Sequence, residues 1–373
     1  MNERLFQKGA NHSQIALLLQ GGGALGAFQA GVFETLYGHG FSPDWIAGTS
    51  IGAVQGALVA GHRTADPVTA LKTFWEAVSD PAAWGTDHLS SLAQEMNSNL
   101  SVLASLLRGR NAFFTPRLAP PLTRLQSVGA ESASYYDVTP LRKLLLRLID
   151  FERINVGPTR LSLGAVNVET GELRYFDSRD ERIGVEHVLA SAALPPAFPA
   201  VRVGDHYYWD GGIYSNTPLE AILDDNPRRN TLCFAVVLFA PDGPEPRSLP
   251  EVEARRKDIV YGTRARQHIA ASRRTHTLRR AIQSLYAQLP EESSRRQENQ
   301  ELAALGCTTH MDVVPIVYRS SQWESANKDA DFSRASIRRR WQLGREHALR
   351  CLEHKPWLST APRHEGVTVH RIN

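Results

Sequence analysis

The chain has 373 residues, of which 42% are apolar and 22% are charged, so it can bury a sizeable core as one large or two modest domains. A net charge of only +3 gives no reason to expect nucleic acid as a partner. The longest uninterrupted apolar run covers residues 232–240, and a membrane-spanning helix needs about 18 or more apolar residues, so none is expected.

The amino-terminal segment and the cysteines indicate a compartment. The first twenty residues carry no basic segment followed by an apolar one, so a classical secretory signal is not expected. Cys233, Cys307 and Cys351 are odd in number and lack Cys-x-x-Cys spacing, which predicts neither a disulfide framework nor a zinc site. We therefore expect a cytoplasmic protein with no metal and no cofactor.

The opening of the chain is predicted to be a strand, a glycine turn and a helix. Residues 14–20 form a short apolar run typical of a buried parallel strand, and residues 24–37 repeat apolar side chains at a helical spacing. A second strand over 44–47 and a helix rich in small residues over 53–60 follow. Together these elements predict a β-α-β-α unit with parallel strands.

Residues 62–135 are interpreted as an insertion between core strands, with a lid as one hypothesis. Helices are predicted within it over 68–78 and 89–107. The elements predicted beyond it are a helix over 141–149, a hairpin of 160–168 with 172–176, a helix over 185–193, a hairpin over 201–209 and a strand over 231–240, the candidate for the sheet centre.

The composition shifts after Pro241, where a long helix is predicted. Residues 254–280 contain nine Lys or Arg residues and one acidic residue. One interpretation of such a run is a solvated helix face, and the other is a surface that contacts anionic lipid headgroups at the inner face of the membrane. A strand over 313–318 and a closing helix over 332–353 complete the prediction.

A serine between two glycines is the first candidate for chemistry. Residues 48–52 read Gly-Thr-Ser-Ile-Gly, the G-x-S-x-G pattern of a nucleophile elbow, in which a strained strand-to-helix turn lifts Ser50 above the sheet. The five letters alone fit a plain tight turn equally well. The predicted strand ending at Gly48 and the helix starting at Ile51 favour the elbow.

A glycine-rich turn precedes this motif by one strand-helix-strand unit. Residues 21–26 read Gly-Gly-Gly-Ala-Leu-Gly and match the spacing of a dinucleotide site, which needs a carboxylate at the end of the second strand, where this chain has Ser50. A purely structural turn is a further alternative. Because neighbouring parallel strands end at the same edge, the N–H groups of Gly22 and Gly23 could instead form an oxyanion hole for a carbonyl attacked by Ser50.

The predicted base for Ser50 is a carboxylate. Asp210 follows a predicted strand and precedes two glycines, so its side chain can lie at the sheet edge without steric interference, although a plain Asp-Gly turn is the alternative. His187 in a predicted helix and His206 in a predicted hairpin are interpreted as structural.

Three short blocks, in this order, resemble the patatin-like phospholipases, a family of lipid acyl hydrolases. The blocks are Gly21 to Gly26, Gly48 to Gly52 and Asp210-Gly211-Gly212, with two supporting phrases, Ala-Ser-Ala-Ala-Leu-Pro at 190–195 and Ser-Asn-Thr-Pro at 215–218. The resemblance covers roughly residues 14–225. It implies an α/β fold of three layers with a mainly parallel central sheet, and the basic C-terminal third is similar to the helical extension of a bacterial subgroup.

The resemblance also implies roles for single residues. Ser50 would be the nucleophile and Asp210 its sole partner and general base. The implied oxyanion hole consists of Gly21, Gly22, Gly23 and Ala24. The implied elbow and turn glycines are Gly26, Gly48, Gly52, Gly211 and Gly212. Many members carry Arg or Lys where this chain has Leu25, so the resemblance does not settle the headgroup preference.

The predicted organisation is an N-terminal tail (1–13), a catalytic domain (14–225) and a part holding the last core strand and the basic helical extension (226–373). The predicted function is a phospholipase A-like serine lipid acyl hydrolase that forms an acyl-enzyme through a Ser-Asp dyad. The alternatives are a soluble carboxylesterase or acyltransferase on small esters, and a non-catalytic nucleotide- or lipid-binding module. No oligomeric state is predicted.

A Ser-Asp dyad places demands on its surroundings. The ordinary pKa of Asp, near 3.9, matches a serine hydroxyl poorly, so desolvation is expected to raise the basicity of Asp210. The oxyanion hole must then supply a large share of the barrier reduction. Because an alkoxide leaves more readily than an amide anion, esters are expected as substrates rather than peptides.

Overall fold

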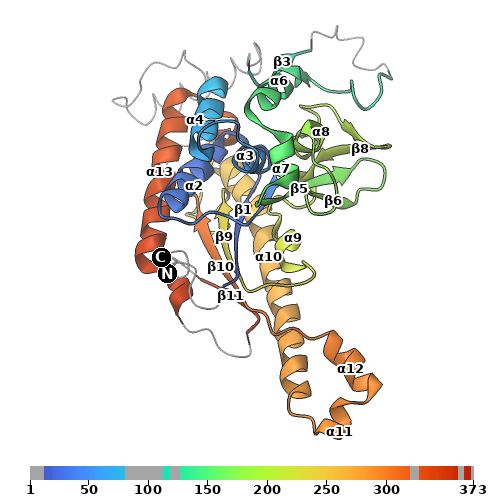
Figure 1. The fold of residues 1–373 in the computed structure, drawn as a ribbon. Coiled ribbons are helices and arrows are strands. Elements are labelled where there is room, and N and C mark those ends of the chain that lie inside the picture. Colours follow the sequence, from blue (N-terminus) through green and yellow to red (C-terminus); the bar gives the residue numbers. More distant parts are fainter. Residues whose placement is uncertain (1–11, 80–111, 118–126, 320–326, 360–364, 371–373) are drawn as a thin grey trace.

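The structure is a computed structural model that describes residues 12–79, 112–117, 127–319, 327–359 and 365–370. A mixed, mostly parallel sheet lies at its centre, and helices cover both faces to give three layers (Figure 1). The strand order is β11-β10-β9-β1-β2-β5-β8-β7, with β6 paired to β5. The predicted α/β class with a mainly parallel central sheet is confirmed.

Parallel strands dominate this sheet. The strands that pair in parallel are β1 (Gln14–Leu19), β2 (Trp45–Thr49), β5 (Arg160–Asn167), β9 (Thr231–Val237), β10 (Met311–Val317) and β11 (Val367–Val369). The antiparallel strands are β6 (Leu173–Asp177), β7 (Val201–Val203) and β8 (His206–Asp210). A separate pair consists of β3 (Thr115–Pro116) and β4 (Tyr136–Asp137). The strands β1 and β9 are buried throughout, as expected for apolar strands covered on both faces.

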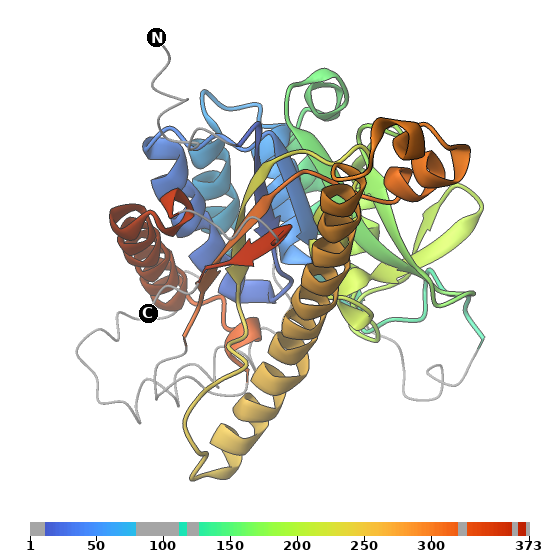
Figure 2. The same cartoon turned by 90° about the horizontal axis from the view of Figure 1, so that it is seen from below.

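Helices from both ends of the chain share one face of the sheet. The main helices on this face are α2 (Gly26–Gly38), α3 (Ile51–Ala60), α4 (Pro67–Val78) and α13 (Arg334–His354). The helices on the opposite face are α9 (Leu219–Leu223) and α10 (Leu249–Tyr286), as Figure 2 shows for α10. The helices α2 and α13 cross closely at Gly31 of α2. A Cβ atom at this position would lie 1.9 Å from the carbonyl oxygen of Trp341, so only glycine fits there.

Shorter helices surround the remaining strands. They are α6 (Thr139–Leu148), α7 (Phe151–Val156), α8 (Val185–Ser191), α11 (Glu291–Ser294) and α12 (Gln297–Ala304). The short 3-10 turns are η1 (Gly23–Leu25), η3 (Gly211–Ile213), η4 (Lys328–Ala330) and η5 (Pro356–Leu358). The end of α10 projects from the sheet together with α11 and α12 (Figure 1). No helix among the described residues is long and apolar enough to cross a lipid bilayer.

The predicted elements are largely confirmed, and the division of the chain differs in two respects. The strand β9 is not the last core strand, because β10 and β11 follow it in the chain and pair beyond it. It is an interior strand that lies next to the central pair β1 and β2. Part of the predicted insertion over 62–135 belongs to the core, since Leu71, Phe74 and Trp75 of α4 are buried there. The helix predicted over 89–107 lies outside the described residues.

Candidate active site

The turn between β2 and α3 holds Ser50 in a strained conformation. Its φ angle is 58° and its ψ angle is −126°, a region that residues other than glycine rarely enter. The Ser50 N–H donates to the carbonyl oxygen of Ser191 at 3.0 Å, and the Ser191 hydroxyl donates to the carbonyl of Gly164 at 2.6 Å. The end of α8 therefore fixes the strained turn, a role that the sequence did not reveal for Ser191.

The sheet register brings Asp210 to this turn. Thr49, the last residue of β2, pairs with Gly164 of β5, and Asp210, the last residue of β8, pairs with the next residue, Ala165. Because β6 occupies the other edge of β5 at both positions, β2 and β8 share one edge and meet end to end. Ser50 follows directly at this junction, so two residues far apart in the chain become neighbours.

The carboxyl group of Asp210 is buried, with 1% of the residue exposed. Its Oδ1 accepts a hydrogen bond from the Gly212 N–H at 2.7 Å, whereas the buried Oδ2 accepts none of ordinary geometry from the described residues. Burial raises the pKa of Asp210 to about 7, against the opposing effects of the Ser50 hydroxyl and the Gly212 N–H. This agrees with the raised basicity expected from desolvation and suits a proton acceptor at neutral pH.

The glycine loop after β1 offers backbone N–H groups to the same place. The Gly21 N–H already donates to the carbonyl of Asn216 at 3.0 Å, and the Asn216 side chain donates back to the Gly21 carbonyl at 2.9 Å. The first bond of the η1 turn runs from the Leu25 N–H to the Gly22 carbonyl at 3.1 Å. The amides that precede this bond, those of Gly22, Gly23 and Ala24, have no acceptor within the turn. Of the four predicted oxyanion-hole residues, Gly21 is thus a fixing point rather than a free donor.

Buried glutamine side chains hold the two ends of this loop through hydrogen bonds. Gln20 accepts hydrogen bonds from the N–H groups of Leu238 and Phe239 at 2.5 and 3.2 Å, so it ties β1 to the end of the β9 segment. Gln29 donates to the Gln20 carbonyl at 2.8 Å, and Gln55 donates to the Gly26 carbonyl at 3.0 Å. No sequence motif pointed to these residues, although glutamines next to the glycine motifs were the available signal.

The predicted elbow and turn glycines are required by close packing. At each of them an added Cβ atom would lie within 3 Å of a neighbouring atom; these glycines are Gly26, Gly48, Gly52, Gly211 and Gly212. The tightest contact is at Gly52, where a Cβ atom would lie 2.1 Å from the Leu19 carbonyl oxygen. The glycines therefore allow β1, β2 and α3 to approach one another around Ser50.

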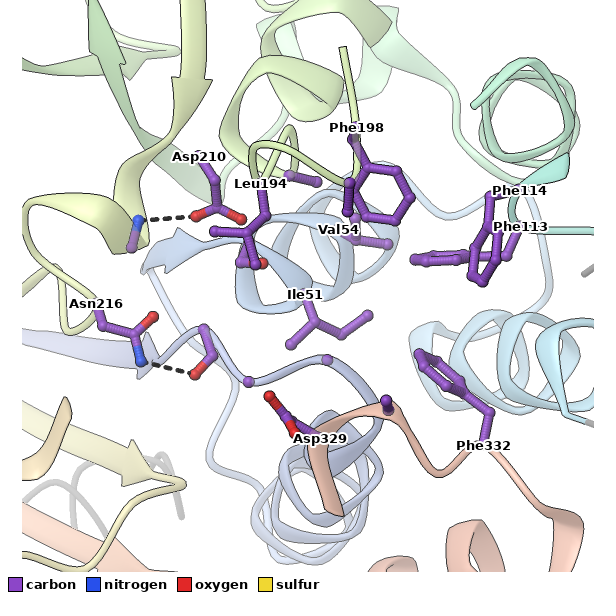
Figure 3. Close-up of a pocket in the computed structure, with 18 of the residues that line it drawn as sticks. Ile51, Val54, Phe113, Phe114, Leu194, Phe198, Asp210, Asn216, Asp329 and Phe332 are labelled. Carbon is purple, nitrogen blue, oxygen red and sulfur yellow. Dashed lines mark hydrogen bonds between the residues drawn. The ribbon is translucent and has the colours of Figure 1, made fainter. Parts of the chain in front are cut away.

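An apolar cavity of about 230 Å³ is lined in part by Ser50. Figure 3 shows many of the side chains that line it. Its polar end contains the glycine loop, Ser50, Asp210 and Asn216. Its apolar walls are formed mainly by Ile51, Val54, Phe113, Phe114, Tyr136, Leu194, Phe198 and Phe332. Leu25 is fully buried in the core and does not line the cavity.

No histidine of the described chain lines this cavity. The His187 ring instead accepts a hydrogen bond from the Gly184 N–H at 2.9 Å and packs edge-on against Phe176, while burial lowers its pKa. His206 is half exposed on β8 and faces Glu169. Neither histidine lines the cavity. Among the described residues, no group of three or more His, Cys, Asp or Glu is placed to hold a metal ion.

Comparison with known proteins identifies the family. The family model described as patatin-like phospholipase matches residues 17–223, more than half of the chain. The chain belongs to the patatin-like phospholipase family. A second family model, described as patatin phospholipase, matches residues 259–364, so the C-terminal region shared with that family includes most of α10, all of β10 and all of α13.

Named relatives match short segments of this chain. A triacylglycerol lipase, SDP1L of Arabidopsis thaliana, is 39% identical over 67 residues, which are 18% of this chain and 8% of the relative. Patatin-like phospholipase domain-containing protein 7 of Rattus norvegicus is 52% identical over 50 residues, which are 13% of this chain and 4% of the relative. The aligned part is thus a small fraction of either relative.

Two solved structures are distant neighbours of this patatin-like chain. VipD from Legionella pneumophila has a TM-score of 0.40 and 14% identity, covering 91% of this chain and 67% of that one. ExoU of Pseudomonas aeruginosa, solved with SpcU, has a TM-score of 0.26 and 15% identity, covering 66% and 48%.

Proposed function

We propose that this chain is a serine lipid acyl hydrolase that cleaves carboxylic esters through Ser50 and Asp210. The observation that carries the proposal is a buried carboxylate, whose pKa is raised to about 7, beside a strained serine at the end of an apolar cavity. A structural carboxylate in such a place would be paired, because burying an unpaired charge costs free energy. The membership in the patatin-like family supports the same proposal.

The first half of the reaction forms an acyl-enzyme. The Ser50 hydroxyl oxygen attacks the ester carbonyl while its proton passes to Asp210, and the N–H groups of Gly22 and Gly23 bind the negative oxygen. The C–O bond to the alcohol then breaks, and Asp210 returns the proton to the leaving oxygen. The alcohol departs and the acyl group stays on Ser50.

The second half releases the acid. A water molecule attacks the acyl carbonyl and gives its proton to Asp210, and the bond to Ser50 breaks as the proton returns to the serine oxygen. The free carboxylic acid leaves. No net proton, electron or metal ion is needed beyond the ester and water.

The cavity favours lipid esters over small ones. Its walls are mostly aliphatic and aromatic side chains, which gain free energy by burying an alkyl chain, about 0.8 kcal/mol for each methylene. The alternative of a carboxylesterase on small esters predicts no preference for long acyl chains. Comparing kcat/KM for p-nitrophenyl acetate, octanoate and palmitate distinguishes the two, and equal values would favour the small-ester enzyme.

The decisive experiment is active-site labelling with a fluorophosphonate. The wild-type chain should be labelled on Ser50, and Ser50→Ala should lose both the label and ester hydrolysis. Ser79→Ala at the end of α4 is the matched control, because that buried hydroxyl donates to the Glu76 carbonyl and does not line the cavity, so the variant should still be labelled. Labelling of Ser50→Ala at the wild-type rate would contradict the proposal and favour a binding module.

Contact of residues 254–280 with anionic lipid at a cytoplasmic membrane face is a subsidiary part of the proposal. Several basic residues of this run bind within the chain; Arg255 and Arg264, for example, donate to backbone carbonyls. The exposed Arg256, Arg266 and Arg274 are the side chains available to headgroups. Replacing these three by Gln should reduce flotation with phosphatidylserine vesicles, and unchanged flotation would remove this part.

A further inference from the structure

A segment far along the chain closes one side of the candidate active site. Asp329, Ala330 and Phe332, in and after η4, line the same cavity as Ser50 (Figure 3). The backbone carbonyl of Asp329 also rests on the glycine loop, since a Cβ atom on Gly23 would lie 2.3 Å from that oxygen. The C-terminal region therefore contacts the proposed oxyanion hole directly.

Two crossed ion pairs hold this segment to α10. Lys328 Nζ lies 2.7 Å from Asp258 Oδ1, and Lys257 Nζ lies 2.9 and 3.1 Å from the two carboxylate oxygens of Asp329. The Lys328 side chain is only 1% exposed, and its ammonium group lies 5.8 Å from the centre of the Phe239 ring. A buried ammonium group is tolerated when it is paired, so the Lys328–Asp258 pair fixes the segment in one position.

The other end of the segment is anchored to α13. Asp331 accepts hydrogen bonds from the Ser333 N–H at 3.0 Å and the Ser336 hydroxyl at 2.6 Å, and Arg340 donates to the Asp331 carbonyl at 2.9 Å. The helix α13 in turn packs along α2, which follows the glycine loop directly. The segment that contacts the glycine loop is thus bound to α10 at one end and to α13 at the other.

We infer that residues 328–332 position the oxyanion loop, and that the pairs Lys328–Asp258 and Lys257–Asp329 are the positioning contacts. The inference rests on the proposed function, because it assigns a task to a loop of that same site. It also gives the C-terminal region a role in the reaction itself. Lys257, Asp258 and Lys328 are positioning residues, since none of them lines the cavity and each acts on the loop through the segment.

Kinetics can separate positioning from simple stabilisation. An oxyanion hole binds the transition state more strongly than the ester, so a misplaced loop lowers kcat and leaves KM nearly unchanged. Loss of global stability without a change at the loop would lower the Tm and leave kcat of the folded protein intact. The two effects are therefore read from different measurements.

The experiment measures kcat, KM and Tm for Asp258→Asn and Lys257→Met in the full-length chain, with a p-nitrophenyl ester as substrate. Asp258→Asn should lower kcat more than tenfold, with KM within twofold of wild type. Lys257→Met breaks the partly exposed pair, which the fold tolerates better, and should lower kcat about threefold to tenfold. It decides the question if Asp258→Asn does not fold.

Two controls complete the test. Asp225→Asn removes a buried partner of Arg160, the first residue of β5, at the end of the strands away from Ser50. It should lower the Tm and leave kcat unchanged. Ser50→Ala must be inactive; if it is active, the proposed function fails and this inference fails with it. If Ser50→Ala is inactive but Lys257→Met keeps wild-type kcat, or changes only KM, the positioning role alone is overturned.

Discussion

Buried carboxylates at the two ends of the parallel strands have opposite surroundings. At the edge where the strands end, Asp210 is buried without a cationic partner in the described chain, and burial raises its pKa to about 7. At the edge where the strands begin, Asp177 and Asp225 both bind Arg160, at 2.8 and 2.9 Å. Arg160 also lies over the ring of Trp45, 3.7 Å from its centre.

Asp312 extends this contrast at the beginning of β10. His12 and His370 lie 2.6 Å from its two oxygens, and His310 lies 3.4 Å away. Burial alone would raise the pKa of Asp312, but the hydrogen bonds from the three histidines hold it well below its usual range. Similar burial thus gives opposite pKa shifts, and the partner decides whether a carboxylate is structural or free to accept a proton.

Replacing Asp210 gives the largest expected effect. Asp210→Asn keeps the shape and the bond from Gly212 but removes the proton acceptor, so ester hydrolysis should fall by about 10⁴-fold. At pH 8 the Asp210→Asn variant should have a higher Tm than the wild type. The raised pKa of Asp210 means that ionising this carboxyl group destabilises the folded state, by an amount that grows as the pH rises from about 4 to about 7. This gain in Tm should shrink as the pH falls toward 4. A variant that keeps activity would remove Asp210 from the reaction.

The glycine loop should be the next most sensitive place. Gly23→Ala puts a Cβ atom 2.3 Å from the Asp329 carbonyl and at a φ angle of +54°, so the loop must move, and loss of an oxyanion donor lowers kcat by about 10²–10³-fold. The matched control is Gly38→Ala at the other end of α2, where nothing lies within 4 Å. It should leave kcat unchanged and alter the free energy of unfolding by no more than about 1 kcal/mol. Equal kcat in both variants would contradict the oxyanion role.

The pH profile tests the raised pKa directly. Asp210 must be ionised to accept the proton, so kcat/KM of the wild type should fall about tenfold for each pH unit below about 7. Stopped assays between pH 5 and 9 with a p-nitrophenyl ester would measure this. A plateau that extends to pH 5 would show that the group is ionised well below its assigned pKa.

The smallest effect on activity is expected from replacing Asp312, at the end of the sheet where the parallel strands begin. Asp312→Asn removes the common partner of three histidines, so the free energy of unfolding should fall by about 3 kcal/mol with kcat of the folded protein unchanged. The lowered pKa of Asp312 means that its contribution is present above the ordinary Asp pKa and is lost in strong acid. Burial lowers the pKa of His310, but the nearby Asp312 carboxylate raises it more, so the pKa is raised overall. The contribution of this ion pair to stability therefore weakens as the pH rises through the raised pKa. Denaturant unfolding at pH 6 and pH 9 would show the larger difference at pH 6.

The sequence predicts the local parts of the site better than their surroundings. Ser50 and the glycine loop were recognisable because an elbow and a tight loop need small residues at fixed spacings. For Asp210 only the direction of the pKa shift was predictable, since its burial arises at the junction of β2 and β8, which depends on a register with β5 that no local pattern encodes. The contribution of Asp329 and Phe332 was missed because it arises from long-range packing of η4 on the glycine loop.

The end-to-end meeting of β2 and β8 makes catalysis depend on strand alignment. Successive side chains of a strand point to opposite faces, so sliding β8 by one residue along β5 would place Trp209 where Asp210 now lies. A one-residue shift of β8 against β5 would therefore abolish activity even if the pairing of β7 with β8 were kept. Catalysis requires one register of β8 on β5, whereas the hairpin of β7 and β8 does not.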